Sequence, residues 1–381
     1  MWSKRSTVDR IRKAVRVPLI QKHNKTLAIM YSMGIVDISQ AIFLSRRIPR
    51  TITSRSGSNA IQWNGYSTDK LALLFNVASI DTLKQLADAL HIPPVVTRHR
   101  YKCSGMDALG LLIARLRSAN TLEMVGETLH LNWSPGMLSS LFNATVGMLV
   151  ERWGTGTRIN LRLLSKSSDR KQMADAVRSV VIDYTIPSVV GFIDGTVLKV
   201  CRPKENEEGA YNGKVRSHAL KFQGLVLPNG MISIMDGPFV GAVHDAAMYS
   251  LSKIAGRLGD ILGDEEFIFG DSAYGLDDVT LTMYKSQRGT PFKELWNKTF
   301  SKVRISVEWP FGQILTLFPF LQRKQLMRLL QSAVGDFYLV ATLLFNCFTC
   351  IYRKNIVSTY FQMTPPTLES YLDTVRLACL D

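Results

Sequence analysis

The sequence predicts an α/β domain in its second half, preceded by a mostly helical and strongly basic first half. Residues 1–150 contain 19 Lys/Arg and 8 Asp/Glu, whereas residues 151–381 contain 27 and 23. From residue 186 onward, strand-like runs alternate with helical patterns, which is typical of α/β folds. We expect a basic, mostly helical region at 1–100, a three-helix unit at 101–160, the α/β domain at 186–352 and a C-terminal tail at 353–381.

The composition is that of a globular protein with an excess of positive charge. Of the 381 residues, 46% are hydrophobic and 20% are charged, and the net charge is +15. A basic half joined to a nearly balanced half predicts contact with a polyanion, and nucleic acid is the leading candidate. A membrane surface is disfavoured, because the basic residues do not lie opposite an apolar stripe.

The first 25 residues form a basic arm, with eight Lys/Arg and one acidic residue. Such an arm acts as a nuclear import signal, contacts DNA phosphates, or is simply the solvated face of a helix, and the sequence does not separate these three interpretations. If the arm contacts DNA, the candidate residues are Arg12, Lys13 and Arg16.

The next feature is a set of three helical patterns between residues 106 and 153. They read "MDALGLLIARLRS", "TLEMVGETLHL" and "GMLSSLFNATVGMLVERW". Ser134 and Pro135 supply an N-cap and a first-turn proline for the last of them. This layout is that of a helix-turn-helix, whose final helix enters a DNA major groove, but it also occurs in plain structural bundles.

The α/β domain begins with three strands, of which the second and third are joined by a turn at Pro228-Asn229-Gly230. A helix, a fourth strand and an amphipathic helix follow. We expect strands at 189–200, 219–227, 231–241 and 265–271, and helices at 244–258 and 301–318.

A further apolar run, "FYLVATLLFNCFTCIY" at 337–352, predicts a buried helix. It is short for a membrane span and contains Asn346. Cys347 and Cys350 have no second Cys/His pair nearby in the sequence, so core packing is favoured over a zinc site.

Four acidic residues of the α/β domain stand among small or apolar neighbours instead of polar ones. They lie in "FIDGT", "AVHDAA", "IFGDSAY" and "ISVEWPF". A carboxylate inside a strand needs a partner, and hard divalent cations prefer oxygen ligands. Two such ions promote phosphodiester cleavage when several carboxylates from different elements hold them. The candidates are Asp194, Asp245, Asp271 and Glu308.

These segments resemble successive blocks of the PIF/Harbinger transposases, which belong to the DDE superfamily of RNase H-like nucleases. The blocks are "GFIDGT", "YNGKVRSHALKFQGLVLPNG", "GAVHDAAMY", "GDSAYG" and "VRISVEWPFG", and they cover roughly residues 186–350. The interval between Asp271 and Glu308 holds 36 residues, close to the spacing of that family.

The resemblance implies an RNase H-like mixed sheet and a catalytic triad of Asp194, Asp271 and Glu308 with two Mg²⁺ or Mn²⁺ ions. Asp245 matches a further acid of the metal site. Arg304 is then expected to pair with a carboxylate or with DNA phosphate. Lys214 and Lys221 are additional candidates for DNA contact.

The implied activity is cleavage of DNA at the terminal inverted repeats of a transposon and joining of the freed 3′-hydroxyl to target DNA. The resemblance also implies a nuclear location, a separate Myb-like partner protein and at least a dimer. Two positions depart from related transposases, since Leu315 replaces a lysine and Ser301 replaces a tyrosine. A second hypothesis is therefore a domesticated DNA-binding protein that no longer transposes.

Overall fold

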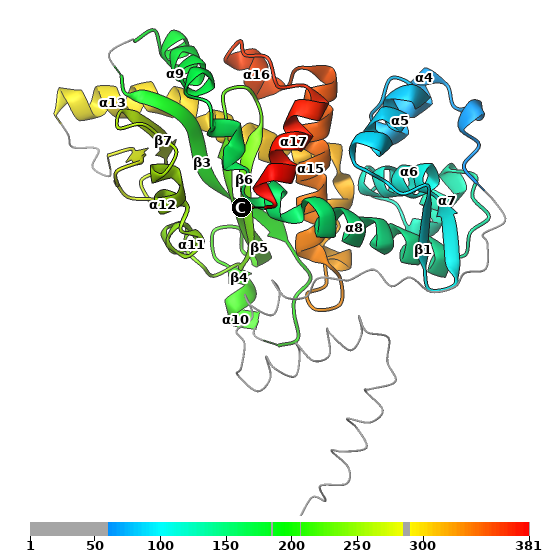
Figure 1. Ribbon diagram of the computed structural model, residues 1–381. Helices are drawn as coiled ribbons and strands as arrows, with labels where there is room; N and C mark the ends of the chain where they lie inside the picture. The colour runs from blue at the N-terminus through cyan, green and yellow to red at the C-terminus, as the bar shows by residue number, and fades with distance from the viewer. Residues whose placement is uncertain (1–59, 184–185, 206, 285–289, 381) are drawn as a thin grey trace, which may run out of the picture.

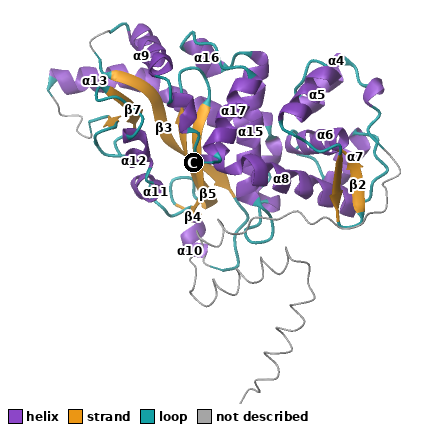
Figure 2. Ribbon diagram, viewed as in Figure 1, coloured by secondary structure: helices purple, strands orange, loops and turns teal. Residues whose placement is uncertain are grey.

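A mixed β-sheet forms the centre of the second half of the chain, and helices cover both of its faces (Figures 1 and 2). The computed structural model describes residues 60–183, 186–205, 207–284 and 290–380. The basic arm with Arg12, Lys13 and Arg16 lies outside these residues. The elements of the first half are η1 (Trp63–Gly65), α4 (Thr68–Phe75), α5 (Ile80–Ala89), β1 (Val95–Arg98), β2 (Tyr101–Ser104), α6 (Gly105–Leu116), α7 (Leu122–Thr128) and α8 (Pro135–Arg158).

The second half begins with a short connection and helix α9, and then enters the sheet. Its helices are η2 (Leu161–Leu164), α9 (Ser167–Val181), α10 (Glu207–Ala210), α11 (Asp245–Ser252), α12 (Ile254–Gly259), α13 (Pro291–Arg304), η3 (Ile305–Val307), α14 (Glu308–Leu317), η4 (Pro319–Gln322), η5 (Lys324–Leu326), α15 (Val334–Tyr352), α16 (Ile356–Tyr360) and α17 (Leu368–Ala378). Its strands are β3 (Ser188–Lys199), β4 (Tyr211–Asn212), β5 (Ser217–Val226), β6 (Ile232–Val240), β7 (Glu266–Gly270) and β8 (Thr280–Thr282).

The strands lie in the order β6-β5-β3-β7-β8, and the short β4 pairs with the start of β5. The pairs β3/β5 and β5/β6 are antiparallel, whereas β3/β7 and β7/β8 are parallel. Three antiparallel strands followed by a crossover to another strand is the predicted order, and the structure shows that this strand, β7, runs parallel to β3. The arrangement is compatible with an RNase H-like fold.

Two strand features were not expected from the sequence. Strand β8 has three residues, which is too short to show an alternating pattern. The β1/β2 hairpin begins at the end of the region 1–100, which was expected to be mostly helical. Pro93 and Pro94 directly precede β1, and prolines there end the preceding helical segment.

The three predicted helices are present as α6, α7 and α8, but a DNA-binding role for this unit is not confirmed. Helix α8 continues to Arg158 and packs on α15, α6 and α17. At Gly156 it approaches α17 so closely that a Cβ atom would lie 2.1 Å from the Val375 carbonyl oxygen. Most of the helix is buried, so its main observed role is to join the first-half helices to the sheet domain (Figure 1).

Helix α15 is the buried helix that the sequence predicts. By length and composition alone it is the one helix in the described ranges that passes the criteria for a membrane span, yet 89% of its apolar window is buried inside the protein. Such a helix is typical of the core of a globular protein. Burial also raises the pKa of the Cys350 thiol to about 12, so the Cys347/Cys350 pair behaves as core packing.

The polar residue of this apolar helix, Asn346, forms hydrogen bonds with the neighbouring strand and helix. Its side-chain amide receives a hydrogen bond from the Ile232 N–H (3.1 Å) and donates to the Ile232 carbonyl (2.9 Å) and the Tyr371 hydroxyl (3.0 Å). Asn346 is fully buried, and it therefore satisfies the backbone of β6 where this strand meets α15.

Replacing Asn346 with leucine is expected to lower the free energy of unfolding by about 2–3 kcal/mol, because the backbone groups of Ile232 lose their partner in the core. Chemical denaturation measures this change. The matched control is Asn143→Leu, whose amide, among the residues that the structure describes, donates to atoms of Ser139 on its own helix. An Asn346 variant as stable as the control would contradict this role.

Candidate active site

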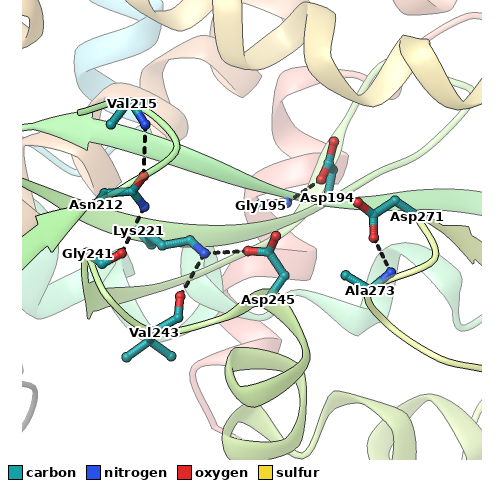
Figure 3. A network of polar contacts seen from close by, with 10 residues as sticks. All are labelled: Asp194, Gly195, Asn212, Val215, Lys221, Gly241, Val243, Asp245, Asp271 and Ala273. Atoms are coloured by element: carbon teal, nitrogen blue, oxygen red, sulfur yellow. Dashed lines mark hydrogen bonds and ion pairs between the residues drawn. The ribbon is translucent and has the colours of Figure 1, made fainter. Parts of the chain in front are cut away.

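Two of the predicted carboxylates lie on neighbouring parallel strands. Phe192 of β3 is paired with Phe269 of β7, and Asp194 and Asp271 each follow two residues later. Asp271 comes directly after β7 and accepts a hydrogen bond from the Ala273 N–H at 2.6 Å, which holds its carboxylate in the turn (Figure 3). The sheet therefore brings Asp194 and Asp271 to the same level.

The third carboxylate, Glu308, begins helix α14 on one face of the sheet. In an antiparallel pair, residues directly opposite each other point to the same face. Asp194 is opposite Gly224, where a Cβ atom would lie 2.5 Å from the Phe311 ring of α14. Asp194 consequently projects toward the side on which α14 carries Glu308.

Arg304 connects two of these acids. Its guanidinium donates to Asp194 at 3.0 Å and to Glu308 at 3.2 Å. Arg304 ends α13 and Glu308 begins α14, with the single turn of η3 between them, so the residues stay four positions apart on a continuous helical path. The predicted pairing of Arg304 with a carboxylate is observed for both.

The electrostatic environment of Asp194 is that of a crowded anionic site. Burial raises the pKa of its carboxyl above the usual value, while Arg304 and the Gly195 N–H act in the opposite direction. The charges of Asp271 and Glu308 raise the pKa further. Asp194 therefore lies close enough to both acids to feel their charge. An additional cation beside it would stabilise the ionised form of its carboxyl.

The donor chemistry of this face fits a hard divalent cation. Asp194, Asp271 and Glu308 offer only oxygen atoms, and a cationic group of the chain, Arg304, already lies between two of them. Within the described ranges, no three Asp, Glu, His or Cys side chains converge closely enough to hold a metal ion as they stand. These acids fit such an ion by the chemistry of their oxygen atoms, and binding one requires that they move closer together and that Arg304 moves aside.

Asp245, the further acid that the resemblance implies, is engaged by a lysine. Asp245 begins α11, and its carboxylate accepts a hydrogen bond from the Lys221 ammonium at 2.6 Å (Figure 3). The same ammonium donates to the Val243 carbonyl at 2.8 Å. The side chain of Lys221 is only 9% exposed. Lys221 therefore has almost no surface with which to meet a DNA phosphate.

The other expected DNA contacts have different surroundings. Lys214 is exposed in the turn between β4 and β5, where Asn212 accepts from the Val215 N–H and donates to the Gly241 carbonyl (Figure 3). This turn is therefore anchored to the sheet while its lysine is exposed to solvent. Arg304 is 22% exposed and bound to the acids described above.

Two polar residues beside the acids were missed by sequence reasoning. Gln223 is fully buried in β5 beside the hydroxyl of buried Tyr274, and neither its amide nitrogen nor that hydroxyl makes a well-aligned hydrogen bond among the described residues. Burial raises the pKa of Tyr274, and the nearby carboxylates of Asp194, Asp245 and Asp271 contribute. A glutamine inside an otherwise apolar strand was the available signal for this polar layer.

Comparison with protein families gives a match in the second half of the chain. Residues 193–346 match the family model described as DDE superfamily endonuclease. The matched segment contains all four acids and ends at Asn346. No curated protein and no solved structure matches the chain. The match supports the DDE transposase superfamily for this part of the chain and, with it, an endonuclease that acts on DNA.

Proposed function

We propose that the protein is a metal-dependent DNA transposase that cuts transposon ends and joins the freed 3′-hydroxyl to target DNA. The observation that carries this proposal is that Asp194 lies close enough to Asp271 and Glu308 to feel the charge of both, with Arg304 between Asp194 and Glu308. These acids come from a strand, a turn after a strand and a helix start. Separate rigid elements are what a precise metal site requires.

In this proposal Asp194, Asp271 and Glu308 hold two Mg²⁺ or Mn²⁺ ions. When bound, such ions activate the attacking water or hydroxyl and stabilise the leaving oxygen. Arg304, which pairs with Asp194 and Glu308 in this structure, would be available in the metal-loaded protein to bind a DNA phosphate through its planar guanidinium. Lys214, exposed on its anchored turn, adds a second phosphate contact.

The finer assignment is to the PIF/Harbinger type, which rests on the five sequence blocks and their spacing. This assignment implies that the protein recognises terminal inverted repeats and is located in the nucleus. It also implies a Myb-like partner protein and an assembly of at least two copies. The predicted phosphate contacts Arg12, Lys13 and Arg16 belong to the same proposal, since a basic arm supplies sequence-independent affinity for DNA.

A specific observation favours a second candidate, a domesticated DNA-binding protein. Leu315 lies seven residues after Glu308, where related transposases carry a lysine, and it packs against the hydrophobic core. That side chain contributes no charge to DNA. The two candidates agree on DNA binding and differ on strand cleavage.

Incubation of purified protein with supercoiled plasmid and Mn²⁺ separates the two. The transposase proposal predicts conversion to nicked and linear forms, with none in EDTA, and retained DNA binding in both conditions. DNA binding without cleavage, also on substrates that carry pre-cut ends, would favour the domesticated protein.

A further inference from the structure

The Lys221–Asp245 ion pair lies on the face of the sheet opposite to the one from which Asp194 projects. Residues of β5 alternate between the faces. Asp194 is opposite Gly224, whereas its neighbour Gly195 is opposite Gln223 and Val197 is opposite Lys221. Lys221 and Gly195 therefore share a face that Asp194 does not.

The glycines of the two strands identify what covers each face. A Cβ atom on Gly224 would meet Phe311 of α14, as described above. A Cβ atom on Gly195 would lie 2.7 Å from a carboxylate oxygen of Asp245 and 3.5 Å from Met248, both on α11. Asp245 thus rests directly against the backbone of the residue that follows Asp194 (Figure 3).

The ion pair fixes Asp245 in this place. Lys221 donates to Asp245 and to the Val243 carbonyl at 2.6 and 2.8 Å, and the two side chains are 9% and 22% exposed. If Asp245 left to bind a metal ion, a largely buried ammonium would lose its anionic partner, which is strongly unfavourable. The ion pair therefore connects β5 to α11, and its carboxylate contacts β3 at Gly195.

We propose that Asp245 and Lys221 are positioning residues that hold β3 at Gly195, and that Asp245 is not a metal ligand. The carboxylate presses against Gly195, and Lys221 keeps it there, so that Asp194 keeps its position toward Asp271 and Glu308. This inference rests on the proposed nuclease function for its effect on catalysis. Its structural part, the coupling of Lys221 to Asp245, does not.

The test measures Mn²⁺ binding to the full chain by calorimetry, together with plasmid nicking and thermal unfolding. Asp245→Asn is compared with Asp271→Asn, which removes a carboxylate from the proposed metal site. We expect Asp245→Asn to keep the Mn²⁺ dissociation constant within about three-fold of wild type, whereas Asp271→Asn weakens binding about ten-fold or more. Asp245→Asn is also expected to lower the melting temperature by several degrees, because the largely buried Lys221 ammonium loses its ionised partner.

A positioning role also predicts a split between rate and affinity. In Asp245→Asn the nicking rate at saturating Mn²⁺ falls about 10–100-fold, while the Mn²⁺ concentration for half-maximal rate stays unchanged. Lys221→Met is expected to show the same split, and the conservative Lys221→Arg to retain most of the rate. Loss of Mn²⁺ affinity in folded Asp245→Asn equal to that in Asp271→Asn would overturn the inference.

Failure of the proposed function gives a different result. If wild type binds no Mn²⁺ and cuts no DNA, the nuclease proposal fails, and the double variant Lys221→Met/Asp245→Asn decides on the pair by its melting temperature. Losses of the two single variants that are not additive support the coupled pair. Additive losses contradict it.

Discussion

Asp194→Asn is expected to abolish Mn²⁺-dependent DNA cleavage while making the metal-free protein more stable at neutral pH. The loss of activity should be on the order of 10³-fold or more, since a metal-binding carboxylate supports several kcal/mol of transition-state stabilisation. The gain in stability follows from the crowding of Asp194 by burial and by two other acids. A structural residue would show the opposite change in stability.

The direction of the stability change in Asp194→Asn follows from the pKa of Asp194. The pKa of Asp194 in the folded protein is raised, mainly by burial. A carboxyl of this kind contributes stability that is present below its unfolded pKa and is lost as the pH rises through its folded pKa. Asparagine cannot ionise, so the variant avoids that loss.

Thermal unfolding in EDTA at several pH values measures the difference. The melting temperature of Asp194→Asn should exceed that of wild type at pH 7, and the gap should close as the pH falls toward the unfolded pKa of Asp. The amide of the variant also retains an oxygen that can accept from the Gly195 N–H, as the Asp194 carboxylate does at 2.8 Å. A variant that is less stable at pH 7, or that still cuts DNA, would contradict the account of Asp194.

Gly195→Ala is expected to reduce cleavage about 100-fold, because displacing a catalytic group by around 1 Å has an effect of this size. The added methyl group would lie 2.7 Å from an Asp245 oxygen, and that oxygen is held by Lys221 at 2.6 Å. Either β3 or the Lys221–Asp245 pair must shift, and a shift of β3 displaces Asp194, which is the residue next to Gly195.

The matched control is Gly256→Ala in α12, where an added Cβ atom meets nothing within 4 Å. Plasmid nicking and thermal unfolding of both variants are the measurements. The control should keep full activity and be no less stable, since alanine favours a helix over glycine. Equal activity of Gly195→Ala and wild type would show that this contact does not position Asp194.

The sequence predicted the elements that carry strong local patterns. The strand-like runs of β3, β5 and β6 and the turn at Pro228-Asn229-Gly230 indicated the antiparallel part of the sheet. The apolar run of α15 indicated a buried helix, and its position against β6 explains Asn346. The spacing of Asp194, Asp271 and Glu308 within recognisable blocks indicated which acids share a site.

What the sequence did not predict depends on contacts between distant segments. The burial of Lys221 follows from the pairing of β5 with both β3 and β6, and the predicted strand at 219–227 did not by itself show that both of its edges would be covered. Asp245 begins a helix in a segment that resembles a metal-site block. Its contact with Gly195, however, places it on the face of the sheet opposite to Asp194. Helix α8 has the pattern of a recognition helix, but α15 and α17 cover it.

The most direct test of the central claim is nicking of supercoiled plasmid in Mn²⁺ by wild type and by Asp271→Asn, with the exposed Asp260→Asn as a matched control. Asparagine at position 271 keeps an oxygen that can accept from the Ala273 N–H, so the turn should persist. The account predicts nicking by wild type and by Asp260→Asn and none by Asp271→Asn. Equal nicking by all three proteins would contradict the assignment of the acids.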